Sequence, residues 1–156
     1  MNRHLEADRR ERSWATGIRI GGALVALTVA AGCATTGGGL TKDTPAEVKA
    51  AAVKERSNAR WAALIKGDVD AAYAYLSPGT RELISLEQYR GRMKTGGFRS
   101  VQIDKVDCET ETCMVGLMLT YDYTPPKGVT QGKGITTYLQ ETWVLEKGQA
   151  WFAWRP

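Results

Sequence analysis

Histidine is nearly absent from this chain of 156 residues, whose single histidine is His4. Because His4 lies in a segment that we expect to be removed, the mature chain would contain none. Such a chain cannot use an imidazole general base, a Ser-His-Asp triad or a histidine-containing metal site. The sequence also shows no glycine-rich phosphate loop, serine-nucleophile motif or cluster of metal ligands, so we expect no cofactor and no metal.

Long hydrophobic runs are missing too. Residues 20–32, IGGALVALTVAAG, carry no charge, but a membrane-spanning helix needs about 20 apolar residues. This run follows an arginine-containing stretch at residues 1–19 and ends in small residues before Cys33. That order is typical of a secretory signal peptide, so we expect residues 1–32 to be cleaved.

The residues before Cys33 resemble the lipobox of bacterial lipoproteins, with Ala30, Ala31 and Gly32 preceding the cysteine and Val29 before them. The resemblance implies a lipidated Cys33 that anchors the chain in a membrane of the cell envelope. An Asp directly after the cysteine would resemble an inner-membrane retention signal, but this position is Ala34. We therefore expect the lipid to lie in the outer membrane, with the domain facing the periplasm. The alternative is ordinary secretion with Cys33 unmodified.

Cleavage would also change the charge of the chain. Residues 1–32 carry five arginines and three acids, so the formal net charge falls from +4 to +2 once they are removed. Nothing then favours nucleic acid as a partner. Residues 33–44 predict a lipidated cysteine and a flexible, glycine-rich tether. Residues 45–156 are enough for one domain with a hydrophobic core.

Two cysteines remain beyond Cys33, namely Cys108 and Cys113 in VDCETETCMV. An even number of cysteines outside the cytoplasm indicates a disulfide. Four residues separate them, which suits a hairpin loop whose first and last neighbours face each other across two strands. A redox or metal-binding pair is the rival interpretation, although the spacing is not C-x-x-C.

Three helices are expected in the first half of this domain. The first begins at Pro45, with Thr44 as its cap and Glu47 completing a capping box, and it ends at Gly67. Its buried stripe comprises Val53, Ser57, Trp61 and Leu64. The second covers residues 68–77 with Asp68 as cap, and the third starts after Ser85, has a capping box with Gln88 and ends at Gly96-Gly97.

After Gly97 the pattern alternates, predicting strands at residues 98–108, 113–125, 135–146 and 149–156, with a loop at 125–134. In the second strand one face carries Val115, Leu117, Leu119, Tyr121 and Tyr123. Met114, Gly116 and Met118 begin the other face, which predicts burial on both sides near the start. In the last strand, Trp151 and Trp154 have opposite parity, so one is expected in the core and the other outside as a candidate partner contact.

Three helices followed by four hairpin-connected strands predict an α+β domain, with the helices on one face of a curved antiparallel sheet. This order resembles the nuclear-transport-factor-two-like, or cone-shaped, superfamily that includes ketosteroid isomerases. The resemblance rests on the helix with Trp61, the GDVDAAYAYLSP element, the 81–95 helix and the closing ETWVLEKGQAWFAWRP hairpin. It implies a pocket between the first helix and the sheet, and a possible homodimer through the sheet.

Enzymes of that superfamily use an acidic general base. Glu141 is the best candidate here, because it alternates with Leu139, Trp143 and Leu145 and should point to the concave face. The alternative is that Glu141 pairs with an Arg or Lys. The residues expected to line the pocket are Trp61, Tyr73, Tyr121, Glu141 and Trp143.

The absence of histidine and of a convincing acid pair favours a non-catalytic binding or accessory module of the envelope. Its partner would be an envelope protein or a small apolar ligand, bound in the concave pocket or on the sheet face. Two alternatives remain: a pocket enzyme of the isomerase or dehydratase type that uses Glu141, and an inhibitor or immunity-like lipoprotein.

Overall fold

The computed structural model describes residues 39–123 and 132–155. Those residues form an α+β domain with four helices and four strands, in which the helices precede the sheet in the chain. The predicted signal peptide, Cys33 and the tether as far as residue 38 lie outside the described residues. Within these residues no helix is both long and apolar enough to cross a membrane.

The longest helix is α1, Ala46–Lys66, which ends at Gly67 as predicted. Gly67 adopts the left-handed conformation with φ 81°, and its N–H donates to the Leu64 carbonyl at 3.1 Å. The prediction for the other end was wrong, because Pro45 itself is the N-cap and no side chain caps α1. The Thr44 hydroxyl instead accepts a hydrogen bond from the Thr41 N–H at 2.9 Å, inside the turn that precedes the helix.

Three short helices follow: α2, Val69–Tyr73; α3, Pro78–Leu83; and α4, Leu86–Arg92. The predicted caps at Asp68 and Ser85 are confirmed, the latter as a capping box with Gln88. The third helix was predicted to extend to Gly96, but α4 ends four residues earlier, at Arg92.

The predicted helix over residues 68–77 is too long, because α2 already ends at Tyr73. A further helix that was not predicted, α3, starts at Pro78 with Ser77 as its cap. The chain leaves the helical conformation before Ser77 because it pairs with the last strand. The Phe152 N–H donates to the Tyr75 carbonyl at 2.8 Å, and the Ser77 N–H donates to the Phe152 carbonyl at 2.9 Å. This pairing joins the short helices to the edge of the sheet.

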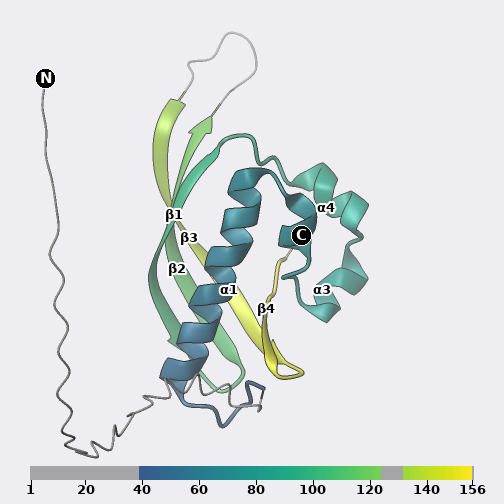
Figure 1. The fold of residues 1–156 in the computed structure, drawn as a ribbon, viewed down its shortest axis with the longest axis vertical. Helices are drawn as coiled ribbons and strands as arrows, with labels where there is room; N and C mark the ends of the chain where they lie inside the picture. Colours follow the sequence, from purple (N-terminus) through teal and green to yellow (C-terminus); the bar gives the residue numbers. More distant parts are fainter. Residues whose placement is uncertain (1–38, 124–131, 156) are drawn as a thin grey trace, which may run out of the picture. The chain divides into compact units, whose positions relative to one another are not determined.

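The four strands are β1, Phe98–Cys108; β2, Thr112–Tyr123; β3, Gly132–Glu146; and β4, Gln149–Phe152. They form one antiparallel sheet in the order β1-β2-β3-β4, with α1 lying across one face (Figure 1). The bounds of β1 agree with the prediction. β3 begins at Gly132, inside the expected loop, and β4 ends at Phe152, so Trp154 lies beyond the strand.

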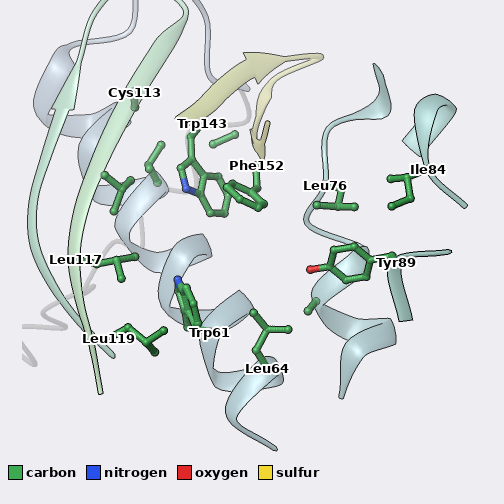
Figure 2. Close-up of a cluster of buried hydrophobic side chains, with 14 residues drawn as sticks. Trp61, Leu64, Leu76, Ile84, Tyr89, Cys113, Leu117, Leu119, Trp143 and Phe152 are labelled. Atoms are coloured by element: carbon green, nitrogen blue, oxygen red, sulfur yellow. The ribbon is translucent and has the colours of Figure 1, made fainter. Parts of the chain in front are cut away.

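The core lies between α1 and the sheet and continues to the short helices (Figure 2). Val115, Leu117 and Leu119 are buried on the covered face, as predicted. Burial on both sides of β2 was a wrong prediction, since Met114 and Met118 are 38% and 37% exposed. Within the described residues no second layer covers that side of the sheet, which we call the open face.

The predicted disulfide between Cys108 and Cys113 is confirmed. The two residues are directly opposite each other in β1 and β2, with their Cα atoms 4.0 Å apart. The bridge therefore closes the β1–β2 hairpin at one end of the sheet.

Candidate functional site

Glu141 lies at the centre of the covered face, and only 5% of it is exposed. One carboxylate oxygen, Oε1, accepts hydrogen bonds from Arg60 Nη1 at 2.7 Å and from Trp61 Nε1 at 2.9 Å. The other, Oε2, accepts from Ser57 Oγ at 3.0 Å and from Trp143 Nε1 at 3.1 Å. Four donors from two elements thus converge on one carboxylate.

The local structure explains this convergence. Ser57, Arg60 and Trp61 are spaced i, i+3 and i+4, so they lie on one face of α1. Trp143 is two residues after Glu141 and therefore projects from the same face of β3. Once α1 packs on this face of the sheet, the indole N–H groups, the hydroxyl and the guanidinium all reach the same carboxylate.

Arg60 is the residue that sequence reasoning missed. It is 3% exposed, and its guanidinium carbon lies 3.9 Å from the centroid of the Phe152 ring. Its Nη2 lies 3.5 Å from the Tyr89 hydroxyl, and its Nε has no hydrogen-bond partner among the described residues. The available signal was its place beside Ser57 and Trp61 on the buried stripe, where a charged residue needs a buried partner.

The chemistry of this cluster is that of a buried ion pair. An ionised carboxylate has about four lone-pair positions, and four protein donors approach this one. A general base must instead come within hydrogen-bond reach of a substrate proton. In the described arrangement the carboxylate of Glu141 is engaged by the protein on both oxygens.

The other predicted pocket residues are divided between different parts of the domain. Trp61 and Trp143 contact Glu141, as described above. Tyr73 donates to the Ile84 carbonyl at 2.9 Å and packs against Tyr89, among the short helices. Tyr121 lies near the far end of β2, directly opposite Ile135. Three of the five predicted residues, Trp61, Glu141 and Trp143, therefore lie together, whereas Tyr73 and Tyr121 lie elsewhere in the domain.

A groove of about 210 Å³ lies between α1 and β1, away from Glu141. Its lining residues are Ala50, Ala51, Lys54, Ile103, Asp104, Lys105 and Val106. Among residues 39–123 and 132–155, no three His, Cys, Asp or Glu side chains gather closely enough to hold a metal ion.

The open face is the exposed side of β1, β2 and β3. It carries Met114 and Met118, and Tyr138, which is 44% exposed and lies directly opposite Met118. The Tyr138 side chain also covers Gly116 so closely that a Cβ atom at this position would overlap its hydroxyl. The apolar groups thus form a continuous strip across β2 and β3.

Two ion pairs flank this strip. Lys105 Nζ lies 2.9 Å from an Asp107 carboxylate oxygen, and this hydrogen bond raises the pKa of Lys105. Arg99 Nη2 lies 2.6 Å from Asp122, which also accepts a hydrogen bond from the Gly134 N–H. The hydrogen bond from the Gly134 N–H has the largest effect in lowering the pKa of Asp122, and the hydrogen bond from Arg99 has the next largest. Each of these two pairs therefore contains one positive and one negative charge.

No protein-family model matches the sequence, and no curated protein is similar to it. The solved structures with partial similarity to this chain include the following two. One is a SEC-C motif protein from Rhodopseudomonas palustris, with 16% identity, a TM-score of 0.45, and 61% of this chain and 70% of that chain covered. The other, from Campylobacter jejuni, is described as an NTF2-like transpeptidase, with 9% identity, a TM-score of 0.45, and 66% and 98% covered.

Proposed function

We propose that this chain is a small lipoprotein of the bacterial cell envelope, and that its domain is a non-catalytic binding module of the nuclear-transport-factor-two-like type. One observation carries the non-catalytic part of the proposal. Glu141, the best candidate for a general base, has both carboxylate oxygens engaged by Ser57, Arg60, Trp61 and Trp143.

The envelope location is supported by the order of the N-terminal residues: a basic stretch, a short apolar run, and small residues before Cys33. The Cys108–Cys113 disulfide is in keeping with it, because such bonds persist outside the cytoplasm. A lipid on Cys33 would hold the domain at the outer membrane, facing the periplasm.

The binding surface of this module is the open face, and its partner is an envelope protein. Methionine side chains adapt to irregular surfaces, and tyrosine is enriched where proteins meet. Met114, Met118 and Tyr138 supply such contacts, while Lys105 and Arg99 beside them are paired with Asp107 and Asp122. A neutral surface of this kind suits a protein partner better than an anionic membrane or a nucleic acid.

The lipid anchor is tested by the intact mass of the full chain purified from membranes, before and after thiol reduction. We expect a chain that begins at Cys33 and carries the additional mass of its acyl groups. Reduction of the disulfide should add the mass of two hydrogen atoms. A chain without lipid, or one that retains residues 1–32, would overturn the anchor.

The binding surface is tested by site-specific photo-crosslinking in intact cells. A photoreactive amino acid at Tyr138 should give one discrete protein adduct, which Met118→Asp should abolish. The same probe at Leu83, which is 76% exposed on α3, is the matched control and should give no such adduct. An adduct at twice the mass of the chain would show that the partner is a second copy of this chain and not another envelope protein. No adduct at Tyr138 would refute the open face as the binding surface.

A further inference from the structure

Two arginines share the ring of Trp151 at the edge of the sheet. The guanidinium carbon of Arg56, from α1, lies 5.0 Å from a ring centroid of Trp151, and that of Arg81, from α3, lies 5.2 Å from it. Arg56 also lies 5.0 Å from the centroid of the Tyr75 ring. Guanidinium groups from α1 and α3 thus both lie near the Trp151 ring of β4.

Arg56 and Arg81 differ from three other arginines of the domain in having no salt-bridge partner among the described residues. Arg60, Arg90 and Arg99 each form a salt bridge with a carboxylate, namely Glu141, Asp70 and Asp122. Within the described parts of the chain, no carboxylate oxygen lies within salt-bridge distance of Arg56 or Arg81. Among the described residues, Glu55 attracts Arg56 electrostatically but forms no salt bridge with it.

The cluster is held in place by further contacts. Arg56 Nε donates to the Ala150 carbonyl at 2.5 Å, and Trp151 Nε1 donates to the Glu146 carbonyl at 2.9 Å. Partial burial lowers the pKa of Arg56, since desolvation disfavours its charged form. Among the described residues the two Nη groups of Arg56 and the whole guanidinium of Arg81 make no hydrogen bond. Their N–H donors are therefore available to a ligand.

We infer that Arg56, Arg81 and Trp151 form a binding site for the oxyanion of a small molecule, a carboxylate or a phosphate group. Guanidinium groups present paired N–H donors that match the oxygens of such anions. Hydrogen bonds between ionised groups are also stronger than those between neutral groups. The Trp151 ring supplies an apolar surface beside the charged group. This site is separate from the open-face strip and does not depend on its proposed partner.

The experiment is a titration of the full-length protein in non-ionic detergent with sodium phosphate and, separately, with sodium acetate. Sodium chloride keeps the ionic strength constant, because surface electrostatics weaken with salt. Binding is followed by the side-chain Nε–H resonances of arginine and by the thermal unfolding midpoint, which rises when a ligand binds the folded state. The variants are Arg56→Gln and Arg81→Gln. Arg92→Gln is the matched control, since Arg92 lies 6.0 Å from the Trp154 ring centroid, outside the cluster.

We expect saturable binding of at least one of the two anions. Its dissociation constant should rise at least tenfold in Arg56→Gln and in Arg81→Gln, and change less than twofold in Arg92→Gln. Saturation by phosphate alone would identify a phosphate-bearing ligand, and saturation by acetate alone would identify a carboxylate. If neither anion saturates the wild type, or if Arg81→Gln binds as tightly as the wild type, the arginines only stack on Trp151 and the inference fails. Arg81→Lys, which keeps the charge but loses the paired donors, should bind more weakly than the wild type while unfolding at a similar temperature.

Discussion

Arg60 Nη1 of α1 donates to Glu141 Oε1 of β3 at 2.7 Å, across a separation of 81 residues in the sequence, and both side chains are buried. Removing two charges from water costs free energy that their mutual attraction offsets only where further hydrogen bonds complete the geometry. Ser57, Trp61 and Trp143 supply those bonds to Glu141. The pair therefore ties α1 to the middle of the sheet at one defined position.

Replacing Glu141 alone should destabilise the domain strongly. Glu141→Gln leaves the Arg60 charge buried without its counter-ion, and breaking a buried pair in this way costs about 3–5 kcal/mol. The check is the free energy of unfolding in urea. Asp70→Asn is the control, because it breaks the exposed pair with Arg90 and should have little effect. Equal losses in the two variants would contradict a dominant role for the buried pair.

Replacing both partners should cost less than the two single changes suggest. Arg60→Met with Glu141→Leu removes both charges together, so no uncompensated ion remains in the core. We expect the double variant to be more stable than Glu141→Gln in the same urea experiment. A loss equal to the sum of the losses in Arg60→Met and in Glu141→Leu would show that the two residues act independently.

Lys49 should stabilise the disulfide end of the sheet. It is 3% exposed, and its ammonium group donates to the carbonyls of Lys42, Glu109 and Thr110 at 2.7, 3.1 and 2.7 Å. Lys49→Met should lower the free energy of unfolding by about 1.5–3 kcal/mol, as expected for hydrogen bonds to a charged group. Amide exchange at Glu109 should also accelerate. Lys54→Met, an exposed change on the same helix, should alter neither quantity.

The Cys108–Cys113 bridge should contribute modestly, because it closes a loop of only a few residues. The chain-entropy relation gives about 2 kcal/mol for so short a loop. Urea unfolding with and without a thiol reductant checks this value. The Cys108→Ala, Cys113→Ala variant should resemble the reduced protein and be insensitive to the reductant. A fully unfolded reduced protein would show that the bridge holds more than its hairpin.

Asp122 should make the stability depend on pH in the acid range. The Gly134 N–H and Arg99 lower its pKa in the folded state, so its carboxylate stabilises the fold above the unfolded pKa, which is about 3.9. This contribution is lost as the pH falls through the lowered folded pKa. Carbon NMR of the Asp122 carboxyl should give a midpoint below the ordinary value, and Arg99→Gln should move it upward. A midpoint that Arg99→Gln leaves unchanged would assign the whole shift to Gly134.

Short-range chemistry made several elements predictable. Alternating apolar residues set the bounds of β1, the left-handed Gly67 ended α1, and Ser85 with Gln88 formed the capping box of α4. Each of these features depends on residues a few positions apart. The close spacing of Cys108 and Cys113 likewise led to their pairing.

Other features were decided by residues distant in the sequence. The break between α2 and α3 arises because Tyr75 and Ser77 pair with Phe152. Met114 and Met118 are exposed because no layer in the described domain covers their side of the sheet, although the apolar sequence predicted burial.

From the sequence came the α+β class, the arrangement of helices before strands, the Cys108–Cys113 disulfide and the expectation of an N-terminal lipid. These depend on local periodicity, capping and spacing. The role of Glu141 depended on long-range packing, since its position on β3 is equally compatible with a solvated base and a buried ion. The packing of α1 on the sheet placed Arg60, Ser57 and two indole N–H groups around its carboxylate, and a buried charge requires such partners.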